Sequence, residues 1–382
     1  MNDSPIDMNE VTRLTREGRL DEAMALLQSR PGVAQPTHTA TGPDAAATGV
    51  AHGDRRSAPP ALAKVLSGLA DRLGLHKRNE PRAHAAPAGQ SGPAPQGARF
   101  ETRRFSAAAG SRNYRLYVPA SYGGGPAPLV VMLHGCTQSA EDFATGTRMN
   151  EVAEAHGALV AYPEQPQSAN PNRCWNWFNS GDQQRDQGEP SLIAGIAREV
   201  IAEFEVAEGR VYVAGLSAGG AGAAVLGTLY PDLFAAVGVH SGLASGAARD
   251  AGTAFAAMRQ GAPAAALSSR AGKKVVPTIV FHGDRDRTVS PINGAQVITQ
   301  ARAGTELAAT STRGQATGGV EFTRTVQSDA GGTPVLEHWE IHGAGHAWSG
   351  GDPRGSHTVA SGPDASREMM RFFLQSARST AA

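Results

Sequence analysis

The pattern of apolar and polar residues divides the chain near residue 98. Beyond this point, strand-like apolar runs occupy 112–119, 129–135, 158–164, 210–217, 234–242, 275–284 and 335–343. Between and after them, 140–156, 192–204, 218–230, 291–303 and 364–377 have the periodicity or composition of helices. This alternation predicts one α/β catalytic domain over 98–378, with a mainly parallel sheet covered by helices on both faces.

The first 97 residues have a different character. Apolar positions within 8–30 predict a short amphipathic helix or a helical hairpin interrupted near Gly18, so we expect an N-terminal helical segment over 1–30. Residues 31–97 are rich in Ala, Pro, Gly and His and contain one further helical pattern at 61–75. Such a composition buries too little apolar surface to fold alone, which predicts a largely disordered linker.

Charge and hydropathy exclude several classes of protein. The 35 Lys and Arg residues balance 35 Asp and Glu residues, which argues against a nucleic-acid partner. No apolar stretch is long enough for a transmembrane helix. The N-terminal residues lack the apolar core of a secretory signal peptide, so the sequence by itself predicts a cytoplasmic protein.

A Gly-x-Ser-x-Gly pattern occupies 215–219, between a predicted strand and a predicted helix. This is the context in which such a serine forms a nucleophile on a sharp turn, and the flanking glycines let the strand and helix backbones pass closely. The amino end of the helix adds a favourable field for a developing anion. We therefore predict Ser217 as the nucleophile of an acyl-transfer reaction.

A nucleophilic serine needs a base and an orienting carboxylate, and in this fold they follow in the order Ser, Asp or Glu, His. Asp284 and Asp286 both follow the strand at 275–284, and the residues alone leave the choice between them open. His346 follows the last strand among small residues and is the predicted base. His342 is its nearest rival but falls inside that strand.

The remaining candidates concern oxyanion stabilisation and the substrate surface. The amide of Ala218, together with that of Cys136 or, second, Thr137, is expected to bind the oxyanion. Trp175, Trp177 and Trp348 are either core side chains or an apolar wall facing the substrate, and we assign them to substrate binding. Cys136 and Cys174, the two cysteines of the chain, are either plain buried residues or one disulfide. Their spacing does not indicate a metal site.

Five segments together resemble the polyhydroxybutyrate depolymerase-type esterases, which are related to feruloyl and acetylxylan esterases. The segments are LHGCTQSAEDFA, NRCWNWF, GLSAGG, FHGDRD and GAGHAWSGG, and the likeness spans roughly 101–375. It implies an α/β-hydrolase fold and cleavage of carboxylic esters, often of short hydroxyacid polymers. It also implies Ser217 as nucleophile and His346 as base. The family pattern His-Gly-x-x-Asp-x-x-Val places its aspartate at Asp286, which decides against Asp284.

The sequence and the resemblance together predict a serine esterase that needs no metal or organic cofactor. The expected substrate is a polyhydroxybutyrate-type polyester or its oligomers, and the alternative is a feruloyl or acetylxylan ester. The family resemblance implies an extracellular location, in contrast to the N-terminal residues. A rival from another class is a non-catalytic protein that binds a polymer or a partner. The N-terminal helix would then dock on a granule or partner surface.

Overall fold

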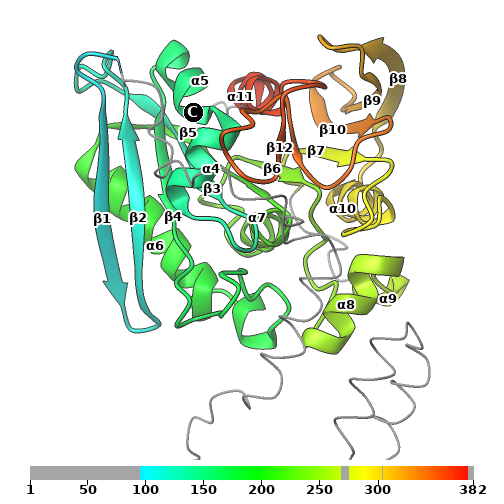
Figure 1. Cartoon of the computed structure of the whole chain (residues 1–382), viewed down its shortest axis with the longest axis horizontal. Helices are drawn as coiled ribbons and strands as arrows, with labels where there is room; N and C mark the ends of the chain where they lie inside the picture. Colours follow the sequence, from blue (N-terminus) through cyan, green and yellow to red (C-terminus); the bar gives the residue numbers. More distant parts are fainter. Residues whose placement is uncertain (1–94, 268–274, 303, 377–382) are drawn as a thin grey trace, which may run out of the picture. The chain divides into compact units, whose positions relative to one another are not determined.

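The computed structural model describes residues 95–267, 275–302 and 304–376. The expected N-terminal helix, most of the linker and the helical pattern at 61–75 lie outside these residues. Ten strands form one sheet in the order β1-β2-β4-β3-β5-β6-β7-β10-β9-β8. Figure 1 shows β1 and β2, in cyan, at one end of this sheet and β8 and β9 at the other.

The middle of the sheet is parallel. Neighbouring strands pair in parallel in the order β4 (Leu159–Pro163), β3 (Ala127–Leu133), β5 (Val206–Leu216), β6 (Ala236–His240), β7 (Thr278–Gly283) and β10 (Pro334–Ile341). Their carboxyl ends therefore meet at one rim, where open α/β sheets bind ligands. β1 (Arg99–Ala107), β2 (Gly110–Val118), β8 (Ala308–Gln315) and β9 (Glu321–Ser328) join by antiparallel pairing.

Alternate side chains of the buried strands enter two separate core layers. In β3, Val131 faces a cluster with α6 (Gly188–Glu203), α7 (Ala218–Leu229), α8 (Ala251–Gln260) and α10 (Ile292–Arg302). Met132 faces the opposite cluster, with α4 (Ala140–Thr147), α5 (Met149–His156) and α11 (Ala365–Gln375). Both side chains are fully buried. Because a strand buried on both faces needs apolar residues at every position, β3 reads as a continuous apolar run. The expected α/β-hydrolase architecture is confirmed.

The segment expected as one helix over 140–156 is two helices. Arg148 takes a left-handed conformation (φ 54°, ψ 23°) and ends α4, with its amide donating to the carbonyls of Ala144 and Thr145. α5 begins at the next residue. Apolar periodicity continues across this break, because both helices bury side chains in the same core layer.

Short elements complete the described residues. They are the 3-10 helix η1 (Ser180–Gln183), α9 (Ala264–Leu267) and the two-stranded pair of β11 (Trp348–Ser349) and β12 (Thr358–Val359). Within the described ranges, the helices are all too short or too polar to cross a membrane.

Candidate active site

Ser217 occupies a strained turn between a buried strand and a buried helix. β5 ends at Leu216, α7 begins at Ala218, and Ser217 itself has φ 57° and ψ −119°. Residues other than glycine rarely adopt a positive φ, and such strain concentrates at functional sites. The Ser217 amide donates to the carbonyl of His240 at 2.9 Å, which ties the turn to the end of β6. The Ser217 residue remains partly exposed at the rim of the sheet.

The glycines of the motif allow strand and helix to approach. A Cβ on Gly219 would lie 2.0 Å from the carbonyl oxygen of Leu133 in β3. A Cβ on Gly215 would lie 2.4 Å from the carbonyl carbon of Gly219. Neither position can hold a larger residue without moving backbone, so both glycines are needed for the geometry of this turn.

His346 and Asp286 form a direct hydrogen-bonded pair. His346 Nδ1 donates to Asp286 Oδ2 at 2.7 Å, with the side chains 9% and 0% exposed. The other carboxylate oxygen of Asp286 accepts from the amides of Thr288 and Val289, each at 2.9 Å. These bonds fix the carboxylate and, through it, the plane of the imidazole. Among the described residues, Nε2 of His346 has no hydrogen-bond partner, so this atom is available for proton transfer.

Asp286 is held in its charged form. Burial alone would raise its pKa, but hydrogen bonds from His282 and His346 outweigh this effect and keep the Asp286 pKa well below its ordinary value. His282 Nε2 lies 3.5 Å from Asp286 Oδ2 and also bonds the carbonyl of Val289 at 2.9 Å. A buried carboxylate in this state can stabilise an imidazolium that forms on His346.

The two rival residues pair with each other instead. His342 Nδ1 lies 3.1 Å from Asp284 Oδ2, and the amide of Gly343 donates to Asp284 Oδ1 at 2.7 Å. His342 Nε2 contacts the hydroxyl of Thr323 at 2.9 Å. Asp284 and His342 are 43% and 34% exposed, in contrast to the buried Asp286. The structure therefore brings together His346 and Asp286, and places Asp284 and His342 in a separate surface cluster.

His240 links the Ser217 turn to the loop that carries His346. Its carbonyl accepts from the Ser217 amide, and its Nε2 accepts from the amide of Ser349 at 3.1 Å. Its ring stacks on Trp348, with the centroids 5.1 Å apart. Within the described residues, the Ser217 hydroxyl has no hydrogen-bond partner. Catalytic hydrogen bonds are often long before substrate binds, so this leaves Ser217 free to engage His346 in the complex.

Two backbone amides beside Ser217 are free for an oxyanion. In the part of the chain described, the amides of Cys136 and Ala218 have no acceptor, whereas that of Thr137 donates to the carbonyl of Asn172 at 2.7 Å. A Cβ on Gly135 would lie 3.6 Å from Cβ of Ser217, so this loop borders the serine. Of the two candidates in the loop, Cys136 is the one whose amide is unused.

The three tryptophans are core side chains. Trp175, Trp177 and Trp348 are 1%, 6% and 0% exposed. The indole of Trp175 donates to the carbonyl of His134 at 3.1 Å, and that of Trp348 donates to the hydroxyl of Ser366 at 3.1 Å. This burial corrects the expectation of an apolar wall facing the substrate. Aromatic side chains clustered in a loop sequence here serve to pack that loop on the domain.

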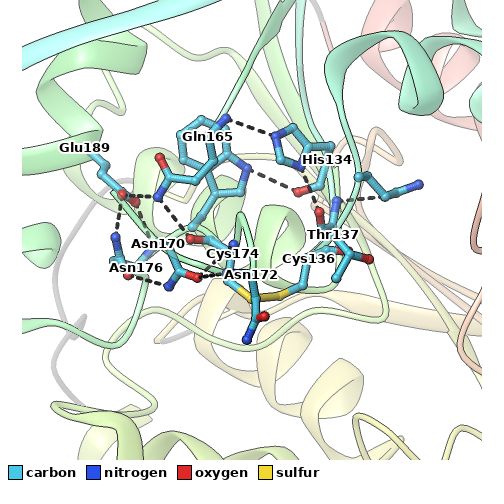
Figure 2. Close-up of a disulfide and its surroundings, with 12 residues drawn as sticks. His134, Cys136, Thr137, Gln165, Asn170, Asn172, Cys174, Asn176 and Glu189 are labelled. Carbon is cyan, nitrogen blue, oxygen red and sulfur yellow. Dashed lines mark hydrogen bonds between the residues drawn. A yellow bond between two sulfur atoms is a disulfide. The ribbon is translucent and has the colours of Figure 1, made fainter. Parts of the chain in front are cut away.

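Cys136 and Cys174 form a disulfide (Figure 2), which settles the choice that the sequence left open. Sequence reasoning also missed three buried groups around the site. His240 and His282 lie at or near the ends of β6 and β7 and gave no signal of a role beside the site, although His282 precedes Asp286 by only four positions. Glu189 gave no signal, because a single carboxylate at the start of an amphipathic helix resembles ordinary helix capping.

A strained serine turn, a buried Asp–His pair and two free amides on the rim of a parallel sheet define an α/β-hydrolase. Residues 112–322 match the model of the Esterase PHB depolymerase family, so the chain belongs to this family. The fold has a similar counterpart in an acetyl xylan esterase from Aspergillus awamori, with a TM-score of 0.58 and 21% identity. That match covers 73% of this chain and 99% of the other.

Two curated relatives extend the comparison. Poly(3-hydroxyalkanoate) depolymerase C of Paucimonas lemoignei is 36% identical over 232 residues, which are 58% of this chain and 55% of the relative. Acetylxylan esterase A of Emericella nidulans is 33% identical over 134 residues, 35% of this chain and 43% of the relative. The chain thus spans 55% of the length of the first relative and 43% of the length of the second.

Proposed function

We propose that this chain is a serine esterase in which Ser217, Asp286 and His346 are the catalytic residues. The observation that carries the proposal is the 2.7 Å bond between His346 Nδ1 and the buried carboxylate of Asp286, on the rim that also holds the strained Ser217 turn. His346 Nε2 takes the proton of Ser217 as the oxygen attacks the ester carbonyl. The amides of Cys136 and Ala218 bind the oxyanion.

Collapse of this intermediate completes the first half of the reaction. His346 returns the proton to the leaving alcohol, and the acyl group stays on Ser217 as an ester. Water then attacks the acyl-enzyme with His346 again as base, and the carboxylic acid and free Ser217 result. The chemistry uses protons and backbone donors alone and requires no metal or organic cofactor.

The substrate class that we propose is a polyhydroxybutyrate-type polyester or its oligomers. Membership of the Esterase PHB depolymerase family and the likeness to a poly(3-hydroxyalkanoate) depolymerase support it. An acetylated or feruloylated plant polysaccharide is the second candidate, which the likeness to an acetylxylan esterase favours. An assay in which a polyester oligomer and an acetylated xylan oligomer compete for the same enzyme would show which substrate class the enzyme hydrolyses with the higher kcat/KM.

We also propose that the protein works in an oxidising environment outside the cytoplasm, such as the extracellular space. The Cys136–Cys174 disulfide supports this location, because such bonds persist outside the reducing cytoplasm. The docking role of the N-terminal helix stays a prediction, since that segment lies outside the described residues.

The catalytic assignment is tested with a soluble short-chain ester and a fluorophosphonate probe. Wild-type protein should hydrolyse the ester and react once per chain with the probe, because both need an activated serine. Ser217→Ala should do neither while keeping the wild-type circular dichroism spectrum. Labelling or turnover that persists in Ser217→Ala would reject Ser217. A well-folded wild type that is inert in both assays would favour the non-catalytic binding protein.

A further inference from the structure

A second histidine contacts the buried carboxylate of Asp286. His282, at the end of β7, is 1% exposed, and its Nε2 lies 3.5 Å from Asp286 Oδ2. The same oxygen accepts the 2.7 Å bond from His346. β7 lies between β6 and β10, with α10 packed beside it (Figure 1). Asp286 is therefore in contact with two imidazole rings, and one of them takes no part in the proposed proton transfer.

The hydrogen bond that His282 makes goes to the turn that holds Asp286. His282 Nε2 donates to the carbonyl of Val289 at 2.9 Å. The amide of Val289 donates in turn to Asp286 Oδ1 at 2.9 Å, beside the amide of Thr288 at the same distance. Val289 is fully buried. His282 thus fixes the carbonyl end of the residue whose amide end fixes the carboxylate.

These partners determine which ring nitrogen of His282 carries a proton. A backbone carbonyl and a charged carboxylate can only accept, so Nε2 is the protonated nitrogen. Among the described residues, the buried Nδ1 of His282 has no hydrogen-bond partner. A proton on Nδ1 would be a buried donor without an acceptor, which is unfavourable. His282 therefore presents a single N–H group, and this group faces the turn that carries Asp286.

The ring of His282 has little room to move, because α10 packs against it. A Cβ on Gly294 would lie 2.7 Å from His282 Nδ1 and 3.1 Å from its Cβ. Gly294 is buried in the first turn of α10, where alanine would be the better helix former. The glycine leaves the space that the imidazole occupies. The ring is thus held at Nδ1 by the helix and at Nε2 by the turn.

We propose that His282 is a positioning residue that holds Asp286, and through it His346, in the orientation that proton transfer needs. The inference rests on the proposed function, because that function makes His346 the base. The carboxylate has to keep its place while an imidazolium forms beside it. Side chains that support catalytic groups supply such fixed geometry, and small displacements are costly. Loss of the His282 N–H group therefore lowers turnover and leaves substrate binding nearly unchanged.

The first comparison uses His282→Leu, which is close to histidine in size but donates no hydrogen bond. On a soluble ester, kcat should fall about 10-fold or more, with KM changed less than about 3-fold. His282→Gln, whose side-chain amide can donate to the Val289 carbonyl, should recover most of the lost kcat. His338→Leu is the matched control, because the buried Nε2 of this histidine in β10 also has no partner among the described residues. It should keep kcat within about 2-fold.

A double-mutant cycle separates positioning from a general effect on the fold. If His282 acts through Asp286, His282→Leu should lower kcat less than about 2-fold further in the Asp286→Asn background. A merely structural role would give the same loss in both backgrounds. Equal losses would therefore overturn the inference, as would wild-type kcat in a folded His282→Leu protein. A His282→Gln protein that is folded but as slow as His282→Leu would overturn it as well.

Gly294→Ala carries the test if His282→Leu does not fold. Its Cβ would displace the ring without removing a polar group, so kcat should fall about 3-fold or more at nearly unchanged KM, and less than about 2-fold in the Asp286→Asn background. Gly252→Ala, near the start of α8, is the control and should keep the wild-type kcat, because the nearest atom to its Cβ would be 3.5 Å away. Wild-type kcat in Gly294→Ala would then overturn the inference. Absence of Ser217-dependent hydrolysis in the wild type would instead reject the proposed function.

Discussion

Asp286 orients His346 by accepting a single 2.7 Å hydrogen bond from its Nδ1, and the accepting carboxylate is itself fully buried and bonded to two backbone amides. Asp284, two residues earlier, faces the exposed His342 instead. The two aspartates share one turn, yet only one of them can orient the base.

Asparagine substitutions at these two positions should therefore differ. Asp286→Asn should lower kcat by about 10³- to 10⁴-fold, because an amide cannot hold the imidazole in the required tautomer. Asp284→Asn should change kcat less than about 3-fold, since it disturbs a surface cluster. Steady-state kinetics on a soluble ester measure both. A larger loss at 284 than at 286 would transfer the orienting role to Asp284.

Gly219 and Gly222 offer a matched test of the serine turn, because both lie in α7. Gly219→Ala should destabilise the protein by about 3 kcal/mol or more, since its Cβ would meet the Leu133 carbonyl at 2.0 Å. A Cβ on Gly222 would meet the end of the Leu133 side chain at 3.3 Å and Cβ of Trp175 at 4.0 Å, and alanine favours a helix, so Gly222→Ala should change the stability by no more than about 1 kcal/mol. Urea unfolding followed by circular dichroism compares them. Equal stabilities would contradict the close approach of α7 and β3.

Buried neutral histidines should make stability depend on pH. Burial lowers the pKa of His240 to about 3 and that of His134 to about 4, below the ordinary value of 6.5. Between these lowered pKa values and 6.5, the histidines are protonated in the unfolded chain but neutral in the folded one. Their contribution to the free energy of unfolding is therefore present above about pH 6.5 and is lost as the pH falls. In this pH range, each of the two histidines should lower the free energy of unfolding by about 1.4 kcal/mol for each unit by which the pH falls.

His240→Gln should remove one such contribution. Urea unfolding between pH 7 and pH 5 should give a slope lower by about 1.4 kcal/mol per pH unit than that of the wild type. His156→Gln, at an exposed position in α5, is the matched control and should keep the wild-type slope. An unchanged slope in His240→Gln would mean that this ring is protonated in the folded protein as well.

A substitution of Trp348 tests whether this tryptophan is a core side chain and does not face the substrate. Trp348→Phe loses the bond to Ser366 and leaves a small void, so we expect a loss of about 1–3 kcal/mol in the free energy of unfolding. KM for a soluble ester should stay within about 2-fold, since the side chain is fully buried and cannot contact a substrate. Unchanged stability with a KM raised 10-fold would restore Trp348 to the substrate surface.

Much of the fold could be predicted from the sequence, because strands buried on both faces must be apolar throughout. Runs such as 129–135 and 210–217 stand out for this reason and lie within one or two residues of the carboxyl ends of β3 and β5. β8 and β9 were missed, since both are rich in polar residues and their side chains are mostly exposed in β8 and mostly half-buried in β9. The order of strands in the sheet is a tertiary property that local patterns do not contain.

The candidate site, like the fold, could be predicted from the sequence only in part. Ser217 has a local signature, because the strained turn needs glycines on both sides. The pairing of Asp286 with His346 depends on which way a turn directs two nearby carboxylates, and neighbouring sequence does not determine that. The disulfide joins residues 38 positions apart, and Glu189 bonds Arg112, 77 positions away, so only the folded chain brings them together.

The central claim is that Ser217 cleaves polyester bonds, and clearing of an amorphous polyhydroxybutyrate suspension tests it most directly. The oxidised wild type should lower the turbidity and release hydroxybutyrate oligomers, while Ser217→Ala at the same concentration should leave the suspension cloudy. Clearing by both proteins would contradict the role of Ser217. No clearing by a wild type that still hydrolyses a short-chain ester would contradict the polyester substrate and favour the acetylated polysaccharides.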